Sequence, residues 1–261
     1  PEGETIAPFT LQNTDEKHLI VDDFQAFVYR DGRSGVEVPY RFFTPRNVNP
    51  DKKYPLVVFL HGAGERGRDN FIQLVANKGA VVWAQPGHQA LHPSFVLAPQ
   101  CPRESSWTGV LSGGEPFEPN PELLALPHLI ENLVSQHNID SDRIYVTGLS
   151  MGGFGTWAIT MESPHLFAGA IPVCGGGEVK KVDRIKHIPI WAFHAEDDPL
   201  VPVAFSRSLV RSLVERGGRV KYTEFLKDYL ESQGWSAHSS WIPAYEDETV
   251  INWLFEQKRG Q

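Results

Sequence analysis

The chain has 261 residues, of which 41% are hydrophobic, and 24 basic against 32 acidic residues give it a formal net charge of -8. That length and apolar content suffice for one large α/β core, and the acidic balance without clustered Lys or Arg argues against a nucleic-acid partner. The two cysteines, Cys101 and Cys174, exclude a disulfide-rich scaffold and lack the neighbouring Cys or His pairs of a zinc site. We expect both thiols to be free and buried.

The start of the chain is unlike a natural N-terminus. It reads Pro1-Glu2-Gly3 rather than Met followed by a basic and apolar leader. No apolar run reaches the length of a membrane-spanning helix, so no membrane span is expected. We therefore expect a trimmed start, from which an export signal or an upstream domain has been removed.

The first predicted element is a hairpin. Residues 18–30 and 36–44 are rich in β-forming side chains, and residues 31–35 between them supply turn chemistry. Residues 56–60 follow as a continuous apolar run, which is typical of a parallel strand covered on both faces, and end at His61. Further runs of this kind are residues 95–98, 144–147, 168–173, 188–193 and 220–225.

Helical periodicity alternates with these strands. Apolar positions recur at intervals of three and four in residues 122–137, 152–162, 203–216 and 245–257. Such alternation predicts an α/β fold: a mostly parallel, doubly wound sheet with helices on both faces and the antiparallel N-terminal hairpin at one end. Residues 99–121 break the rhythm and are expected to form a long loop near the site. No composition shift marks a second domain, so residues 1–261 are expected to form a single one.

Residues 148–152 read Gly-Leu-Ser-Met-Gly, between the apolar run 144–147 and a helical segment. This pattern is typical of a nucleophile elbow, a sharp strand-to-helix turn that exposes a serine hydroxyl. Gly148 and Gly152 are small enough to let strand and helix nearly touch. The five residues alone also occur in ordinary glycine-rich turns, so the assignment of Ser150 as a nucleophile depends on its context.

A serine nucleophile needs a histidine to take its proton and a carboxylate to orient that histidine. In sheets of this type both follow the serine in sequence, on loops after later strands. Asp198 lies after a predicted strand, with Asp197 as its close competitor, and a solvated turn or a helix cap is the alternative role for either. His238 alone lies on a loop after the last predicted strand.

Two histidines, His61 and His194, end predicted strands, and we expect them to hydrogen-bond loop backbone rather than to act as bases. The seven other histidines, at positions 18, 88, 92, 128, 137, 165 and 187, lie in surface-like contexts without partner motifs. His238 therefore remains the only candidate for the general base.

An oxyanion hole requires two N–H donors that are fixed before the tetrahedral intermediate forms. Met151 is the first expected donor, and Ala63 in the glycine-rich loop after residues 56–60 is the second, with Gly64 as its alternative. Gly64, Trp107 and Trp241 are candidates for the substrate pocket. Large aromatic residues in such segments are more often part of the core, so that role competes with simple packing.

Four segments give the chain a resemblance to a known family. They lie at residues 61–67, 98–102, 142–153 and 174–177. Together they resemble the α/β-hydrolase fold of the esterase group that includes predicted peptidases, poly(hydroxyalkanoate)-depolymerase-like and feruloyl-esterase-like enzymes. The resemblance covers most of the chain.

The resemblance also distinguishes between the two candidate acids. Relatives carry the acid in a His-Gly-x-x-Asp-x-x-Val-Pro pattern, which aligns with residues 194–202 and implies Asp198 rather than Asp197. Ala195 stands where that pattern has glycine. The family histidine occurs in a Gly-His-x-x-Trp context, and here Ala237 replaces the glycine before His238.

The resemblance implies a serine carboxylesterase that hydrolyses short- to medium-chain acyl esters through an acyl-enzyme, without a metal or an organic cofactor. The substrate would be a small-molecule or polymer-borne ester. Because many relatives are exported and some carry an immunoglobulin-like domain, an extracytoplasmic location is expected, with the cytoplasm as the alternative. Two other functions remain open: a serine peptidase that uses the same residues, and a non-catalytic binding protein of the same fold. The oligomeric state is left open.

Overall fold

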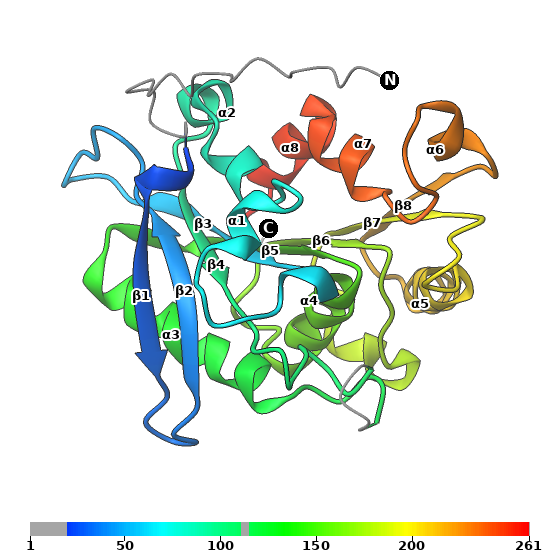
Figure 1. Ribbon diagram of the computed structural model, residues 1–261, viewed down its shortest axis with the longest axis horizontal. Helices are drawn as coiled ribbons and strands as arrows, with labels where there is room; N and C mark the ends of the chain where they lie inside the picture. Colours follow the sequence, from blue (N-terminus) through cyan, green and yellow to red (C-terminus); the bar gives the residue numbers. More distant parts are fainter. Residues whose placement is uncertain (1–19, 111–114, 261) are drawn as a thin grey trace, which may run out of the picture.

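Eight strands form one sheet in the computed structural model, which describes residues 20–110 and 115–260 (Figure 1). The strand order is β1-β2-β4-β3-β5-β6-β7-β8. The strands are β1 Phe24–Arg30, β2 Glu37–Phe43, β3 Tyr54–Leu60, β4 Phe95–Pro99, β5 Ile139–Leu149, β6 Gly169–Val173, β7 Ile190–Ala195 and β8 Val220–Phe225. β1 and β2 pair antiparallel, β2 joins β4 antiparallel, and all the other pairs are parallel.

The expected N-terminal hairpin is present. Its turn is closed by Asp31, whose carboxylate accepts hydrogen bonds from the backbone N–H and the hydroxyl of Ser34, at 2.8 and 2.6 Å. Gly35 has a φ of 74°, a conformation that glycine adopts without strain. Residues 18 and 19 of the predicted first strand lie outside the described residues. The antiparallel end of an otherwise parallel sheet is therefore as predicted.

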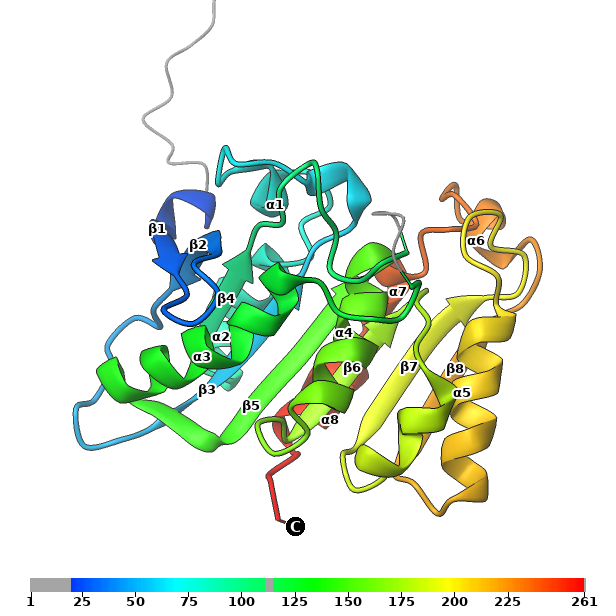
Figure 2. The same cartoon turned by 90° about the horizontal axis from the view of Figure 1, so that it is seen from below.

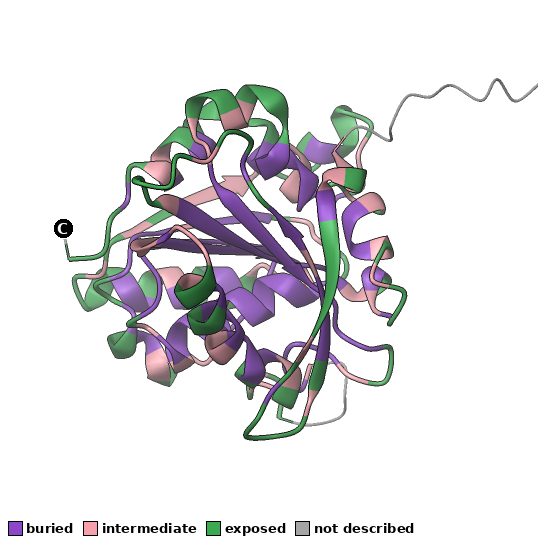
Figure 3. Ribbon diagram, turned by 90° about the vertical axis from the view of Figure 1, so that its left-hand side faces the viewer, coloured by how far each residue is buried: buried purple, intermediate pink, exposed green. Residues whose placement is uncertain are grey.

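The apolar runs at residues 56–60, 95–98 and 144–147 are buried, as predicted. The run at residues 220–225 was expected to be covered on both faces in the same way, but it forms the edge strand β8, in which no residue is buried. Every residue of β4 and β6 is buried, and in β3 only Tyr54 is partly exposed. By contrast, β1 at the edge of the sheet exposes most of its residues (Figure 3). Parallel strands are stable only when helices cover both faces, and this is the arrangement observed.

Helices cover the two faces of the sheet (Figures 1 and 2). One face is covered by α3 Pro121–Gln136, α4 Met151–Glu162 and α5 Ala204–Glu215. The other face is covered by α1 Ile72–Val75, α2 Pro86–Leu91, α7 Trp241–Glu246 and α8 Glu248–Phe255. The short helix α6 Tyr229–Ser232 follows β8. The sheet has a hydrophobic core on each face. Leu129 of α3 and Trp157 of α4 pack in one core, and Tyr245 of α7 and Leu254 of α8 pack in the other. Among the described residues, no helix has both the length and the apolar character needed to cross a bilayer.

One predicted helix is wrong in detail. Residues 245–257 were expected to be continuous, but the chain forms two helices that meet at Asp247. Asp247 has extended backbone angles, and its carboxylate accepts a hydrogen bond of 2.7 Å from the Thr249 N–H. The apolar periodicity runs through this point, yet the aspartate satisfies a free N–H at the start of α8 and so begins a new helix.

Candidate active site

The nucleophile elbow is formed where β5 ends and α4 begins. Ser150 lies between them with φ 53° and ψ -118°, a backbone conformation that a residue with a Cβ rarely adopts. Its N–H donates to the Val173 carbonyl at 3.0 Å, and its carbonyl accepts from the Phe154 N–H at 3.1 Å. The surrounding backbone thus holds a conformation that costs about 1–3 kcal/mol, as strained functional residues commonly do.

Close backbone contact explains the two glycines of the elbow. A Cβ on Gly152 would lie 1.9 Å from the Leu60 carbonyl oxygen, and one on Gly148 would lie 2.4 Å from the Gly152 carbonyl oxygen. Both obstacles are backbone atoms of a buried strand or of the elbow itself, so neither can move aside cheaply.

We therefore expect Gly152→Ala to be strongly destabilising. The overlap with Leu60 should lower the free energy of unfolding by about 3 kcal/mol or more. For a chain of this size that corresponds to a fall in Tm of roughly 6–12 °C, measurable by circular dichroism or calorimetry. Gly87→Ala is the matched control, since a Cβ there meets nothing within 4 Å. Equal Tm values for the two variants would contradict the packing argument.

Three side chains that are distant in sequence form one hydrogen-bonded row. The Nε2 atom of His238 lies 2.9 Å from the Ser150 hydroxyl, and its Nδ1 atom lies 2.7 Å from Oδ2 of Asp198. They follow β5, β7 and β8, whose carboxyl ends share one edge of the sheet. His238 is 8% exposed. The structure thus brings together the serine, histidine and aspartate selected from the sequence.

Asp198 is held as a carboxylate. Its Oδ1 accepts hydrogen bonds from the Leu200 and Val201 N–H groups, both at 2.9 Å, and its side chain is fully buried. Burial raises the pKa of Asp198, but hydrogen bonds from His194 and His238 outweigh that effect and hold the pKa well below its usual range. The ionised Asp198 accepts a hydrogen bond from Nδ1–H of His238, which keeps the proton on Nδ1 and leaves Nε2 unprotonated towards Ser150.

The competing acid does not reach the histidine. Asp197 is partly exposed, and its carboxylate accepts a hydrogen bond of 2.8 Å from the Asp228 N–H in the loop before α6. That is the turn role considered for it as an alternative. Adjacent aspartates therefore point to different partners, and only Asp198 contacts His238.

The two strand-ending histidines bind loop backbone, as predicted. The Nδ1 atom of His61 lies 2.6 Å from the Gly62 carbonyl, and its Nε2 accepts from the Cys101 N–H at 2.9 Å. Burial lowers the pKa of His61 to about 4, which keeps the ring neutral. His194 lies 2.9 Å from the Val201 carbonyl. It also lies 3.5 Å from Asp198, a contact with the acid that the sequence did not reveal.

The expected oxyanion donors begin two helical turns. Met151 is the first residue of α4, and Ala63 is the first residue of the 3₁₀ turn Ala63–Glu65. The first N–H groups of a helical turn have no carbonyl partner within it, so they are available to an anion. Gly64, the alternative donor, is exposed in the same turn.

One of the candidate pocket residues is corrected by the structure. Trp107 is fully buried in the core, and its indole N–H donates a hydrogen bond of 2.9 Å to the His61 carbonyl, so it supports the glycine-rich loop from behind. Trp241 is partly exposed, and its ring lies edge-on to His238 with centroids 5.4 Å apart. Gly64 and Trp241 therefore remain candidates for contact with a substrate, and Trp107 does not.

An aromatic group beside the elbow was not foreseen. Phe117, Phe154 and Phe205 pack together with ring centroids 5.7–6.2 Å apart. Phe154 lies one helical turn after Ser150, and Phe205 is 36% exposed in the first turn of α5. They come from three separate segments, so only the fold could show that they meet. Part of the loop that carries Phe117, residues 111–114, lies outside the described residues.

Both cysteines are free and buried, as expected. The Cys174 sulfur and ligand atoms of Asp198 and His238 lie within 4.8 Å of one another, a grouping that could in principle hold a metal ion. However, both ring nitrogens of His238 already face hydrogen-bond partners, and burial raises the pKa of the Cys174 thiol well above its usual range. The grouping thus follows from the packing of the hydrogen-bonded row against β6.

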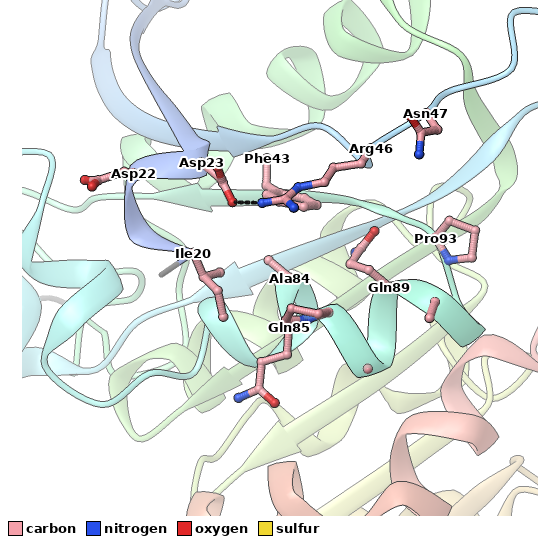
Figure 4. Close-up of a pocket in the computed structure, with 13 residues that line it drawn as sticks. Ile20, Asp22, Asp23, Phe43, Arg46, Asn47, Ala84, Gln85, Gln89 and Pro93 are labelled. Atoms are coloured by element: carbon pink, nitrogen blue, oxygen red, sulfur yellow. Dashed lines mark hydrogen bonds and ion pairs between the residues drawn. The ribbon is translucent and has the colours of Figure 1, made fainter. Parts of the chain in front are cut away.

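A pocket of about 570 Å³ lies elsewhere on the molecule, between the start of β1 and α2 (Figure 4). Its walls include Ile20, Phe43 and Ala84, and the ion pair between Arg46 and Asp23, 2.9 Å apart, crosses one side. Ser150, Asp198 and His238 are not among the residues that line this pocket. Pocket size therefore does not identify the chemical site in this molecule.

Comparisons with known proteins agree with this fold. A family model, the prolyl oligopeptidase family, matches residues 127–199. Poly(3-hydroxyalkanoate) depolymerase C of Paucimonas lemoignei is 34% identical over 125 residues, covering 47% of this chain and 28% of the depolymerase. The crystal structure of a thermostable esterase is 61% identical, has a TM-score of 0.92 and matches 97% of this chain and 68% of its own. A ferulic acid esterase structure, 16% identical with a TM-score of 0.65, covers 89% of this chain and 98% of its own and shares the fold.

The depolymerase and the thermostable esterase are longer than this chain. It spans 28% of the depolymerase and 68% of the thermostable esterase chain. The activity, substrates and partners of the whole protein are therefore matters for proposal. The 61% identity to the esterase nevertheless extends over 97% of this chain.

Proposed function

Because the chain belongs to the carboxylesterase group of the α/β-hydrolases, we propose that it hydrolyses carboxylic esters through an acyl-enzyme on Ser150. The observation that carries this proposal is the row in which His238 lies 2.9 Å from the serine hydroxyl and 2.7 Å from Asp198. Such a row supplies a general base and an oriented acid at one nucleophile.

The first half-reaction follows from the positions of these atoms. Nε2 of His238 takes the proton of the Ser150 hydroxyl as the oxygen attacks the ester carbonyl. The electron pair of the carbonyl moves to its oxygen, which the N–H groups of Met151 and Ala63 stabilise. The tetrahedral intermediate then collapses, the bond to the alcohol oxygen breaks, and the imidazolium returns its proton to the leaving alcohol.

Deacylation repeats the sequence with water. His238 removes a proton from a water molecule, the resulting hydroxide attacks the acyl carbonyl, and the proton passes back to Ser150 as the acid leaves. The buried carboxylate of Asp198 stabilises the imidazolium in both steps, since a charge pair is stronger where water is excluded. The strained backbone of Ser150 keeps its hydroxyl directed at the histidine throughout.

We propose short- to medium-chain acyl esters as substrates. The aromatic group of Phe117, Phe154 and Phe205 supplies apolar surface one helical turn from the nucleophile, and Trp241 borders the histidine. Apolar contacts of this kind favour a hydrocarbon portion of a few carbons, each contributing up to about 0.8 kcal/mol. A comparison of kcat/KM for p-nitrophenyl esters from acetate to palmitate tests this proposal; a maximum at the long-chain end would contradict it.

The proposed acyl-enzyme predicts a burst. When the protein is mixed rapidly with a p-nitrophenyl ester, p-nitrophenolate should appear first in an amount equal to the enzyme and then at the steady rate, provided that deacylation is slower than acylation. After acid quenching, mass spectrometry should place the acyl group on the peptide that contains Ser150. A fluorophosphonate probe should label the same residue. Failure of the probe to react would instead favour a non-catalytic binding protein.

A serine peptidase is the second candidate, and the match of residues 127–199 to the prolyl oligopeptidase family favours it. An amide differs from an ester in that its amine leaving group must be protonated as it departs. For an esterase, we expect kcat/KM for an acyl p-nitrophenyl ester to exceed that for the matched p-nitroanilide by more than about 10³-fold. A peptidase should show a smaller ratio of ester to anilide hydrolysis. A ratio close to one would favour the peptidase.

A further inference from the structure

A buried carboxyl lies behind the loop that carries the expected oxyanion donor Ala63. Glu65 is the third residue of that 3₁₀ turn and is only 5% exposed, although no arginine or lysine is paired with it within the described residues. Burying a carboxyl group is unfavourable unless it is well compensated. A side chain that merely filled space here could be apolar, so Glu65 requires an explanation.

The contacts of Glu65 tie the loop to its surroundings. Its Oε1 accepts a hydrogen bond from the Asn77 amide, and its backbone carbonyl accepts one of 3.1 Å from the Gln100 amide. Its own N–H donates to the Gly62 carbonyl at 3.3 Å. These bonds join the turn to the segment after α1 and to the loop after β4, so one residue connects three parts of the chain.

The second carboxyl oxygen faces the start of the same turn. A Cβ on Gly62 would lie 3.3 Å from Oε2 of Glu65 and 2.8 Å from the side chain of Leu149, the residue before the nucleophile. Oε2 has no hydrogen bond of ordinary geometry with the described residues, and His61 Nδ1 lies 3.8 Å away. Gly62 is therefore held between Glu65 on one side and the nucleophile elbow on the other.

We propose that Glu65 is a positioning residue that holds Gly62 and Ala63 in the conformation that presents the Ala63 N–H to the oxyanion. The proposal rests on the ester hydrolysis proposed above. A glutamate at the third position of a helical turn that folds back onto the residue before the turn is a known way to fix the start of a helix. Fixed donors are valuable to catalysis because they need not reorganise in the transition state.

The charge state of Glu65 offers a specific readout. Burial raises its pKa to about 7, against the lowering effects of the Gly62 N–H and the Asn77 amide. Above that pH a negative charge lies two residues from the proposed oxyanion donor and opposes the developing charge. We therefore expect kcat to fall by about threefold to tenfold as the pH rises through 7.

The other charged or titratable groups around Glu65 do not change charge near that pH. Burial lowers the pKa of His61 to about 4 and raises that of Tyr245, on α7, well above its usual range. Burial also acts to raise the pKa of Asp69, but its backbone hydrogen bonds keep it below the usual value. The Nε of Arg66 donates to the Ala63 carbonyl at 3.0 Å.

The test compares kcat, KM and Tm of Glu65→Gln, Glu65→Ala and Asn77→Ala from pH 5.5 to 9. We expect Glu65→Ala to lower kcat by about 10- to 100-fold with KM changed less than about threefold, since a misplaced donor weakens transition-state rather than substrate binding. Glu65→Gln, which keeps the shape and an acceptor, should retain kcat within about threefold at pH 6 and lose the decline above pH 7. Asn77→Ala should lower kcat in the same direction as Glu65→Ala.

Glu104→Gln is the matched control, because Glu104 is exposed and pairs with Arg68 on a neighbouring loop. It should leave the pH profile unchanged. A lower Tm with unchanged kcat in Glu65→Ala, or a pH profile of Glu65→Gln identical to that of the parent, would overturn the proposal. If Glu65→Ala does not fold, the pH profile of Glu65→Gln still tests the proposal. Acylation of Ser150 by a fluorophosphonate in every variant separates this outcome from failure of the proposed esterase function.

Discussion

Ser150→Ala should lower kcat for p-nitrophenyl butyrate by about 10⁵- to 10⁶-fold, because no acyl-enzyme can form without the hydroxyl. A residual rate above that of water is expected from the oxyanion donors and from substrate binding. Alanine keeps the Cβ, so the unusual backbone angles at this position are no harder to adopt. The variant should therefore melt within a few degrees of the parent, and the loss reports chemistry rather than folding.

Ser135→Ala is the matched control for this substitution. Ser135 is exposed in the last turn of α3, where its hydroxyl bonds the Asn132 carbonyl. It should retain the parental rate. Retention of more than a tenth of the parental rate by Ser150→Ala, in a preparation free of host esterases, would rule out Ser150 as the nucleophile.

Sequence patterns predicted the framework because its determinants are local. An unbroken apolar run such as residues 56–60 can be stable only where both faces are covered, and the glycines at 148 and 152 permit an approach that a Cβ would block. The strand-to-helix turn, the antiparallel hairpin and the parallel sheet follow from these signals. Chemical necessity then selected His238, since a serine needs a base and only one histidine followed the last strand.

What the sequence could not show depends on contacts between distant segments. The sequence left Trp107 open between the substrate pocket and the core, and its buried position depends on a distant partner, the His61 carbonyl, to which its indole N–H donates. The aromatic group around Phe154 arises only when α4, α5 and the loop that carries Phe117 meet. Spacing also left Asp197 and Asp198 open, and only the resemblance to the family separated them. Their different hydrogen bonds in the fold give the physical distinction.

That distinction predicts a large effect for Asp198→Asn. Oδ1 of Asp198 accepts from two backbone N–H groups, at Leu200 and Val201, and an asparagine there must place its carbonyl oxygen at this position. Its NH₂ group then faces Nδ1 of His238 and donates to it. The imidazole is driven into the tautomer that carries its proton on Nε2, which faces the Ser150 hydroxyl and can no longer take a proton from it.

We expect kcat to fall by about 10⁴-fold in Asp198→Asn, with the Ser150 hydroxyl still in place. Asp197→Asn provides a control one residue away with the same change of charge, and it should alter kcat by less than about twofold because Asp197 contacts the Asp228 N–H rather than the histidine. Steady-state rates of both variants at one pH are sufficient. Comparable losses in the two would mean that net charge near the loop, rather than the orientation of the imidazole, controls the rate. A much larger loss in Asp197→Asn than in Asp198→Asn would show that Asp197, rather than Asp198, is the acid.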